Sequence, residues 1–277
     1  MTAPTAPTLS AITARLRAAG CVFAEDEAQL LVSVAASPED LDAMVCRRTA
    51  GVPLEYVVGW AEFCGLRIAV DPGVFVPRRR TEFLVQQASA LAGTGAVIVD
   101  LCCGSGAVGV ALVASLGRAE LHASDIDPVA VRCARRNVEA VDGCAYAGDL
   151  YDPLPATLRG RVDILAVNAP YVPTGSIGLM PPEARLHEAR VALDGGADGL
   201  DVVRRVSAAA RKWLAPSGHL LVETTDRQAD QVADLFTADG LASRLASSEE
   251  VGATVAIGER VARHARRVTS SSANGDT

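Results

Sequence analysis

The sequence predicts an α/β fold, in which a parallel sheet is covered by helices on both faces and preceded by a small helical bundle. Two observations predict it. From residue 95 onward, short β-favouring apolar runs alternate with amphipathic helical patterns, and before residue 51 only helical patterns occur. Such alternation is typical of parallel strands joined by crossover helices. Ligands of these sheets bind beyond the carboxyl ends of the strands, so the residues that follow each strand are the candidates for function.

Three short helices are expected within residues 9–50. The first pattern ends at Gly20, which suits a helix C-cap. The third begins with Ser37 as N-cap, Pro38 at the first helical position and Asp40 three residues after the cap. Helices of this length form a small bundle, which is more often a recognition module than a catalytic one.

Residues 56–77 have a different pattern. Apolar and polar residues alternate, and the turn sequence Asp71-Pro72-Gly73 lies among them. This pattern predicts a β-hairpin that joins the bundle to the sheet.

Four strands and three helices are expected in the larger part. The strands are residues 96–103, 119–125, 161–168 and 219–225, and the helices are residues 106–117, 127–140 and 201–218.

Composition excludes several classes of protein. The chain has 277 residues, about half of them apolar, and a net charge of −7, which argues against a strong grip on nucleic-acid backbones, although the local basic run Arg78–Arg80 leaves a small patch open. Seven cysteines without a Cys-x-x-Cys pair indicate reduced thiols, and the four histidines have no metal-ligand spacing. The sequence has neither a signal peptide nor an apolar run long enough to span a bilayer, so we expect a cytoplasmic protein that is not embedded in a membrane. We also expect no metal site.

A glycine-rich loop follows the first predicted strand of the sheet. Gly104, Gly106 and Gly109 form Gly-x-Gly-x-x-Gly, which fits NAD and also any other nucleotide-like ligand at a helix N-terminus. Asp125 lies about twenty residues on, at the end of the next strand, where a carboxylate can accept both hydroxyls of a ribose.

Asp100 distinguishes these two ligands. It stands at the end of the strand, just before the loop. A carboxylate there would repel a pyrophosphate but attract the ammonium and sulfonium groups of S-adenosylmethionine. The order Asp100, loop, Asp125 therefore favours the methyl donor. The alternative is that Asp100 caps a turn and the glycines only allow close packing.

The stretch Asn168-Ala169-Pro170-Tyr171 follows the strand that ends near Val167. The Asn168 side-chain oxygen and the Ala169 carbonyl can accept hydrogen bonds from both N–H groups of a planar amide, which stabilises the charge that forms on methylation. Pro170 biases Ala169 toward an extended conformation, and the Tyr171 ring can pack on the planar group. The alternative is an ordinary turn after a strand.

Several motifs together resemble the protein-(glutamine-N5) methyltransferases that modify peptide release factors. They are "GVPLEYVVGWAEFCGLRIAVDPGVFVPRRRTEFLV", "VDLCCGSGAVGVAL", "SDIDPVAVRCARRN", "GDLYDPLP", "DILAVNAPYVPT" and "EARVALDGGADGLDVVRRV". The resemblance implies a Rossmann-like, seven-stranded class I methyltransferase domain, S-adenosylmethionine as donor and a glutamine side chain as acceptor. It further implies a helical substrate-recognition domain over residues 1–55, a hairpin linker over 56–78 and a methyltransferase domain over 79–268, before a disordered tail at 269–277.

The resemblance also implies roles for individual residues. Asp125 would bind the ribose, Asp149 and Leu150 would lie beside the adenine, and Asn168 to Tyr171 would hold the glutamine, with Asn168 also contacting the donor. The donor loop would be Cys102, Cys103, Gly104, Ser105 and Gly106. Glu188 and the stretch Asp194–Gly199 match the family without a role that the residues themselves indicate. The partner would be a protein carrying a glutamine, a release factor in the family, and we expect a monomer without direct contact to nucleic acid.

Two positions depart from the family pattern. Ala169 stands where the family has proline, so some rigidity is lost while the backbone acceptor survives. Cys102 stands where the family has glycine, and a positive φ there would cost roughly 1 kcal/mol. Both departures indicate a diverged paralogue.

Two other functions remain open. An N6-adenine nucleic-acid methyltransferase meets the same chemical problem with a similar turn, although the acidic composition argues against it. A donor-binding scaffold without activity is the second.

Overall fold

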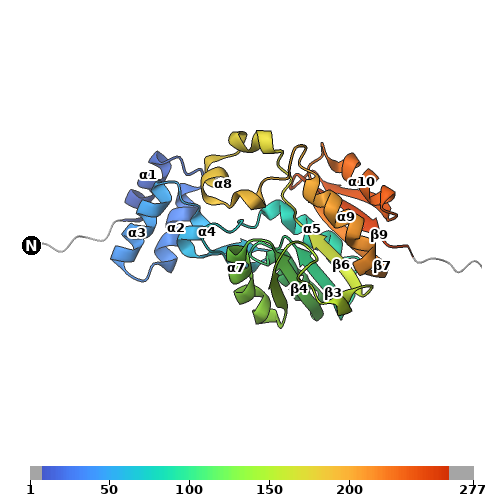
Figure 1. Ribbon diagram of the computed structural model, residues 1–277. Coiled ribbons are helices and arrows are strands. Elements are labelled where there is room, and N and C mark those ends of the chain that lie inside the picture. The colour runs from blue at the N-terminus through green and yellow to red at the C-terminus, as the bar shows by residue number, and fades with distance from the viewer. Residues whose placement is uncertain (1–7, 262–277) are drawn as a thin grey trace, which may run out of the picture.

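Four helices precede the first strand in the computed structural model, which describes residues 8–261. They are α1 (Leu9–Ala18), α2 (Ala24–Val34), α3 (Pro38–Thr49) and α4 (Leu54–Val58), and they gather at one end of the molecule (Figure 1). Their apolar faces form a separate small core. As expected, the Ser37 side chain accepts from the Asp40 amide and begins α3, and Gly20 has a positive φ just after α1.

The hairpin consists of β1 (Trp60–Phe63) and β2 (Leu66–Ala69), paired antiparallel. Its turn is Cys64–Gly65, and both residues have positive φ, a geometry that matches the twist of the two strands. The expectation that Asp71-Pro72-Gly73 lies within the hairpin is therefore wrong. That segment forms a second turn after β2, and the Gly73 carbonyl instead accepts from the Ala189 amide at 3.1 Å.

The main sheet has seven strands in the order β5-β4-β3-β6-β7-β9-β8. The first five are parallel, whereas β9 is antiparallel to both of its neighbours. The predicted parallel sheet is thus confirmed over five strands, and the last two strands add an antiparallel edge. The strands are β3 (Ala96–Leu101), β4 (Ala119–Asp125), β5 (Cys144–Ala147), β6 (Val162–Val167), β7 (Leu214–Thr224), β8 (Ala242–Ser248) and β9 (Ala253–Glu259).

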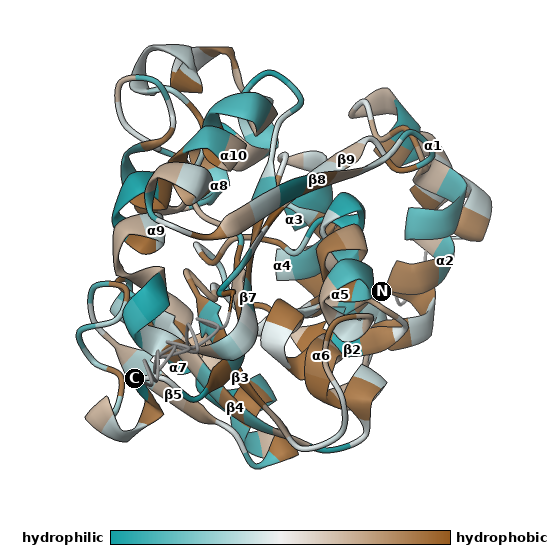
Figure 2. Cartoon of the chain, turned by 90° about the vertical axis from the view of Figure 1, so that its right-hand side faces the viewer, coloured by the Kyte–Doolittle hydropathy of each residue, from teal (hydrophilic) through white to brown (hydrophobic). Residues whose placement is uncertain are grey.

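Helices cover both faces of this sheet. On one face lie α5 (Glu82–Ser89), α6 (Ala107–Leu116) and α7 (Pro128–Val138), and on the other α9 (Asp201–Trp213) and α10 (Ala229–Ala238). Alternate residues of β3 serve the two cores: Ile98 packs on the α6 side and Val99 on the α9 side. Helix α6 is mostly hydrophobic (Figure 2), and its residues from Ala107 to Leu112 are buried. The other helical turns are η1 (Arg79–Thr81), η2 (Glu139–Val141), η3 (Ala156–Leu158), η4 (Thr174–Leu179), α8 (Pro182–His187) and η5 (Arg190–Ala192).

An ion-pair cluster, buried at Glu27 and exposed at Glu183, joins the N-terminal helices to the rest of the chain. Arg48 of α3 donates from Nε to Glu27 Oε2 of α2 at 2.6 Å and from Nη1 to Glu183 Oε1 of α8 at 2.5 Å. Figure 1 shows α8 between the N-terminal helices and the sheet domain. Helix α8 therefore bridges the two parts. Across residues 8–261, no helix has the length and apolar character that crossing a bilayer requires.

Asn137 of α7 connects β2 to the loop that follows β3. Its Nδ2 donates to the Ala69 carbonyl at 2.9 Å and to the Ser105 carbonyl at 2.8 Å, and its Oδ1 accepts from the Ala69 amide at 2.9 Å. The side chain is buried. This single amide thus aligns the hairpin with the glycine-rich loop.

We predict that Asn137→Ala lowers the free energy of unfolding by roughly 2–4 kcal/mol, because the Ser105 carbonyl and the Ala69 amide lose their partner and the Ala69 carbonyl keeps only the Cys133 thiol. Chemical denaturation measures this. The exposed Gln86→Ala on α5 is the control and should stay within about 0.5 kcal/mol of the parent. A loss for Asn137→Ala as small as the control's would contradict the assigned role.

Candidate active site

A cavity of about 290 Å³ lies at the carboxyl ends of β3, β4 and β6. From β3 the chain continues outward to β4 and β5, and later returns to the opposite side of β3 as β6. Such a switch point is where open α/β sheets bind ligands.

The cavity brings together most of the predicted donor-binding residues. Nine of the ten contribute to its wall: Asp100, Cys102, Cys103, Gly104, Ser105, Asp125, Asp149, Leu150 and Asn168. Gly106 does not. A Cβ on Gly106 would lie 2.8 Å from the Val138 side chain, and one on Gly109 would lie 2.7 Å from Leu121. The second and third glycines of the motif therefore serve helix packing, whereas the first faces the cavity.

The glycine-rich loop is tied to Asp125. Asp125 Oδ2 accepts from the Gly104 amide at 2.8 Å, and Asp125 Oδ1 accepts from the Asp127 amide at 2.9 Å. The half-buried carboxylate therefore has a fixed orientation. Burial raises the pKa of Asp125, and the two amide bonds lower it in part. Cys102 does have a positive φ, of 55°, so the expected cost of about 1 kcal/mol relative to glycine applies.

Asp100 lies at the bottom of the cavity and is almost fully buried. Its Oδ2 accepts from the Gly109 amide at 2.9 Å. Burial raises its pKa to about 7, with the nearby charge of Asp125 as a smaller cause. A carboxylate that is this costly to ionise is suited to a cationic ligand.

Sequence patterns did not indicate Arg205. It comes from α9, lines the cavity and donates from Nη2 to Asp149 Oδ2 at 2.5 Å. Fifty-six residues separate the two partners, so no local motif joins them. This pair borders the cavity beside Leu150.

The four predicted acceptor residues also line the cavity, directly after β6. Asn168 Nδ2 donates to Thr81 Oγ1 over a long 3.4 Å. Within residues 8–261 its Oδ1 has no hydrogen-bond partner, so the oxygen is available for a ligand. Ala169 is buried in the core on the α9 side.

Arg80 and Glu223 hold Tyr171, and the sequence did not predict either role. Arg80 donates from Nη2 to the Tyr171 hydroxyl and from Nε to Glu223 Oε1 at 3.0 Å. Glu223 is buried at the end of β7, and no partner for its Oε2 exists among the described residues. The tyrosine ring is thereby fixed at the wall of the cavity.

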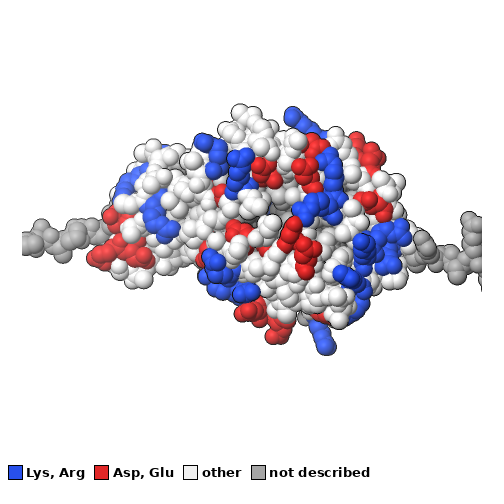
Figure 3. All heavy atoms as spheres, in the orientation of Figure 1, with Lys and Arg blue, Asp and Glu red and all other residues white. Residues whose placement is uncertain are grey.

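Two arginines of the run Arg78–Arg80, which the sequence left open as a basic patch, are paired with buried glutamates. Arg78 pairs with the buried Glu188, which also accepts from the Val76 amide at 3.3 Å, and Arg80 pairs with Glu223. On the face drawn in Figure 3, acidic and basic side chains are interspersed.

Comparison with known proteins agrees with this architecture. A family model described as the methyltransferase small domain matches residues 65–197. A methyltransferase from Pyrococcus furiosus has a similar fold, with a TM-score of 0.54 and 14% sequence identity over 72% of this chain and 90% of that chain.

Two curated relatives are closer in sequence. A release factor glutamine methyltransferase of Geobacter sulfurreducens is 36% identical over 230 residues, which cover 81% of this chain and 80% of the relative. A 4-amino-L-phenylalanine/4-methylamino-L-phenylalanine methyltransferase of Streptomyces pristinaespiralis is 34% identical over 269 residues, which cover 88% of this chain and 91% of the relative. The chain belongs to the family of the release factor glutamine methyltransferases.

Proposed function

We propose that this protein transfers a methyl group from S-adenosylmethionine to the side-chain amide nitrogen of a glutamine in a peptide chain release factor. One observation carries the proposal: the glycine-rich loop after β3 and the Asn-Ala-Pro-Tyr turn after β6 line the same cavity. A donor in the loop and an amide in the turn would therefore meet. Alignment of this kind is worth much of the barrier to a bimolecular reaction.

The residues present fit S-adenosylmethionine, which supplies an electrophilic methyl group on a sulfonium. Asp125 would accept from the ribose hydroxyls. The buried Asp100 would interact with the cationic methionine part. Asp149 and the Leu150 backbone would lie beside the adenine, and Cys102, Cys103, Gly104 and Ser105 would line the donor between its ribose and its methionine part. An anionic, enclosed wall favours a cationic donor over a pyrophosphate.

Asn168 and Ala169 would act on the acceptor. The Asn168 Oδ1 and the Ala169 carbonyl accept from the two N–H groups of the glutamine, which draws the nitrogen toward tetrahedral geometry and stabilises its developing positive charge. Pro170 restricts Ala169 to an extended conformation. Tyr171, held by Arg80, would flank the planar amide.

The helices of residues 1–55 would contact the protein substrate, with residues 56–78 as linker and 79–268 as catalytic domain. Val22 and Phe23, between α1 and α2, expose 83% and 69% of their surface, as a protein-binding module would. The expected tail at 269–277 lies outside the described residues. We further propose that the protein acts as a monomer and without nucleic acid, in keeping with its net charge of −7.

An aromatic amine is the second candidate acceptor. The Streptomyces pristinaespiralis relative aligns with 88% of this chain, and its name specifies 4-amino-L-phenylalanine. An aniline nitrogen has a delocalised lone pair, as an amide does, so the same two carbonyl acceptors would serve it.

The acceptor and the role of Asn168 are tested together. The protein is incubated with S-adenosylmethionine and either a release factor or 4-amino-L-phenylalanine, and products are identified by mass spectrometry. We expect one methyl group on a release-factor glutamine and none on the amino acid. Asn168→Ala should abolish transfer while donor affinity, measured by calorimetry, stays within a few-fold. Near-normal turnover by this variant would refute the role of Asn168, and methylation of the amino acid alone would refute the glutamine acceptor.

For the ribose contact, we predict that Asp125→Ala weakens donor binding by about 1–3 kcal/mol, because a charged hydrogen-bond acceptor is lost. Calorimetric titration with S-adenosylmethionine measures this. Asp226→Ala, at an exposed carboxylate beyond β7, should bind the donor as the parent does. Equal affinities for the two variants would place the ribose elsewhere.

Donor affinity should also depend on pH through Asp100. Burial raises its pKa to about 7, and a cationic donor favours the ionised form, so binding should tighten as pH rises from 6 to 7.5. The expected change is roughly five- to tenfold. Asp100→Asn cannot ionise and should show a flatter profile. Identical pH profiles for parent and variant would contradict this assignment.

A further inference from the structure

The loop Asp194–Gly199 lies against the backbone of the segment that continues the acceptor turn. The Val172 amide donates to the Leu193 carbonyl at 3.1 Å, and the Gly195 amide donates to the Val172 carbonyl at 2.9 Å. The Thr174 amide donates to the Gly196 carbonyl at 2.9 Å. Three backbone bonds therefore bind the two segments together like strands, outside the main sheet.

Glycines make this approach possible. A Cβ on Gly195 would lie 2.7 Å from the Pro170 carbonyl oxygen. Gly199 has a φ of +82°, and a Cβ there would lie 2.2 Å from the Tyr171 carbonyl oxygen. Both contacts are with backbone of the acceptor turn, so no side-chain movement could relieve them.

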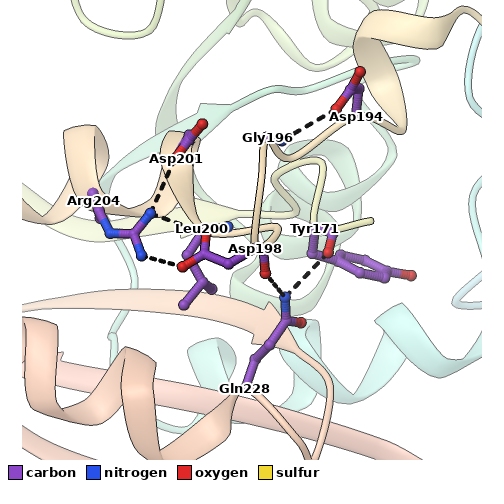
Figure 4. Close-up of polar contacts among 8 residues, drawn as sticks. All are labelled: Tyr171, Asp194, Gly196, Asp198, Leu200, Asp201, Arg204 and Gln228. Atoms are coloured by element: carbon purple, nitrogen blue, oxygen red, sulfur yellow. Dashed lines mark hydrogen bonds and ion pairs between the residues drawn. The ribbon is translucent and has the colours of Figure 1, made fainter. Parts of the chain in front are cut away.

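Gln228 fastens the same two segments with its side chain (Figure 4). Its Nε2 donates to the Tyr171 carbonyl and to the Asp198 carbonyl, each at 3.1 Å. Its Oε1 accepts from Thr225 Oγ1 at 2.8 Å, which determines which way the amide faces. The Gln228 side chain is buried, so these bonds are at least partly shielded from water.

The loop is also tied to itself on both sides of this contact. Asp194 Oδ1 accepts from the Gly196 amide at 3.2 Å and from Thr174 Oγ1 at 2.5 Å. Asp198 accepts from Arg204 on α9 (Figure 4). The surface against which Gln228 holds the turn is therefore itself ordered.

We propose that Gln228 is a positioning residue for the methyl acceptor, and that Gly195 and Gly199 allow the loop to approach closely enough for it to act. By fixing the Tyr171 carbonyl, Gln228 sets the direction of the turn in which Asn168 Oδ1 and the Ala169 carbonyl stand. Ala169 lacks the ring that would restrict its own φ, so the turn relies on these outside contacts. The inference depends on the proposed function in one respect only, namely that the methyl acceptor is the glutamine side chain.

The test replaces Gln228 with glutamate, which keeps the shape but sets a carboxylate against two carbonyl oxygens. Gln231→Glu is the matched control, since it makes the same change at an exposed position one turn along α10. Hydrogen exchange at the Val172 and Thr174 amides reports on the turn. We expect at least tenfold faster exchange in Gln228→Glu and parent rates in Gln231→Glu.

Turnover is then measured with a release factor at saturating donor and divided by the number of donor-binding sites, which removes any effect of unfolded protein. We expect Gln228→Glu to lose at least tenfold in kcat while its donor affinity stays within twofold, because only the acceptor side is disturbed. Thr225→Val, which removes the hydroxyl that orients the amide, should show a smaller loss of the same kind. If Gln228→Glu does not fold, Thr225→Val takes its place in both measurements.

Two results would overturn the inference. One is hydrogen exchange at the Val172 and Thr174 amides of Gln228→Glu that is as slow as in the parent. This result does not depend on which substrate the protein methylates. The other is faster exchange with undiminished kcat. Failure of the proposed function gives a different result, namely a parent protein that transfers no methyl group to the release factor.

Discussion

The site depends on the pairing of β3 with β6. Ile98 to Leu101 lie in register with Ile164 to Val167, so two parallel strands end side by side. The glycine-rich loop follows the carboxyl end of β3, and the Asn-Ala-Pro-Tyr turn follows the carboxyl end of β6. Because the carboxyl ends of parallel strands meet at one edge, a cationic donor and a planar acceptor are brought into a single cavity without any flexible connection. A slip of one residue in this pairing would turn the side chains of one strand end to the opposite face.

Charge in the cavity wall is matched by groups from distant segments. Glu223 pairs with Arg80, Glu188 with Arg78 and Asp149 with Arg205, while Asp100 has a backbone amide. Replacing pairs of this kind by apolar residues often leaves stability unchanged, so stability alone does not explain them. Here each pair fixes a segment that lines the cavity: the Tyr171 ring, residues 76–78 and the side near Leu150.

Two side-chain amides fix the backbone around the cavity, as the ion pairs fix its side chains. Asn137 fastens the donor loop to the hairpin, and Gln228 fastens the acceptor turn to the loop Asp194–Gly199. Each buried amide donates to two backbone carbonyls: Asn137 to those of Ala69 and Ser105, and Gln228 to those of Tyr171 and Asp198. Together they hold both sides of the cavity rigid, which suits a reaction in which alignment supplies much of the rate.

The sequence by itself determined the local features: the cap of α3, four strands of the sheet, the glycine-rich loop and the turn after β6. Each of these features depends on the backbone preferences and the spacing of apolar side chains over a few neighbouring residues, so the local sequence pattern predicts it. The two-residue turn at Cys64–Gly65 is also local, but the stronger turn sequence Asp71-Pro72-Gly73 obscured it. Only the tertiary structure decided the antiparallel β9 and the roles of Arg80, Arg205, Glu223 and Gln228. Their partners lie dozens of residues away in the chain, and an arginine or glutamine on a helix has the same local pattern whether it faces water or a buried carbonyl.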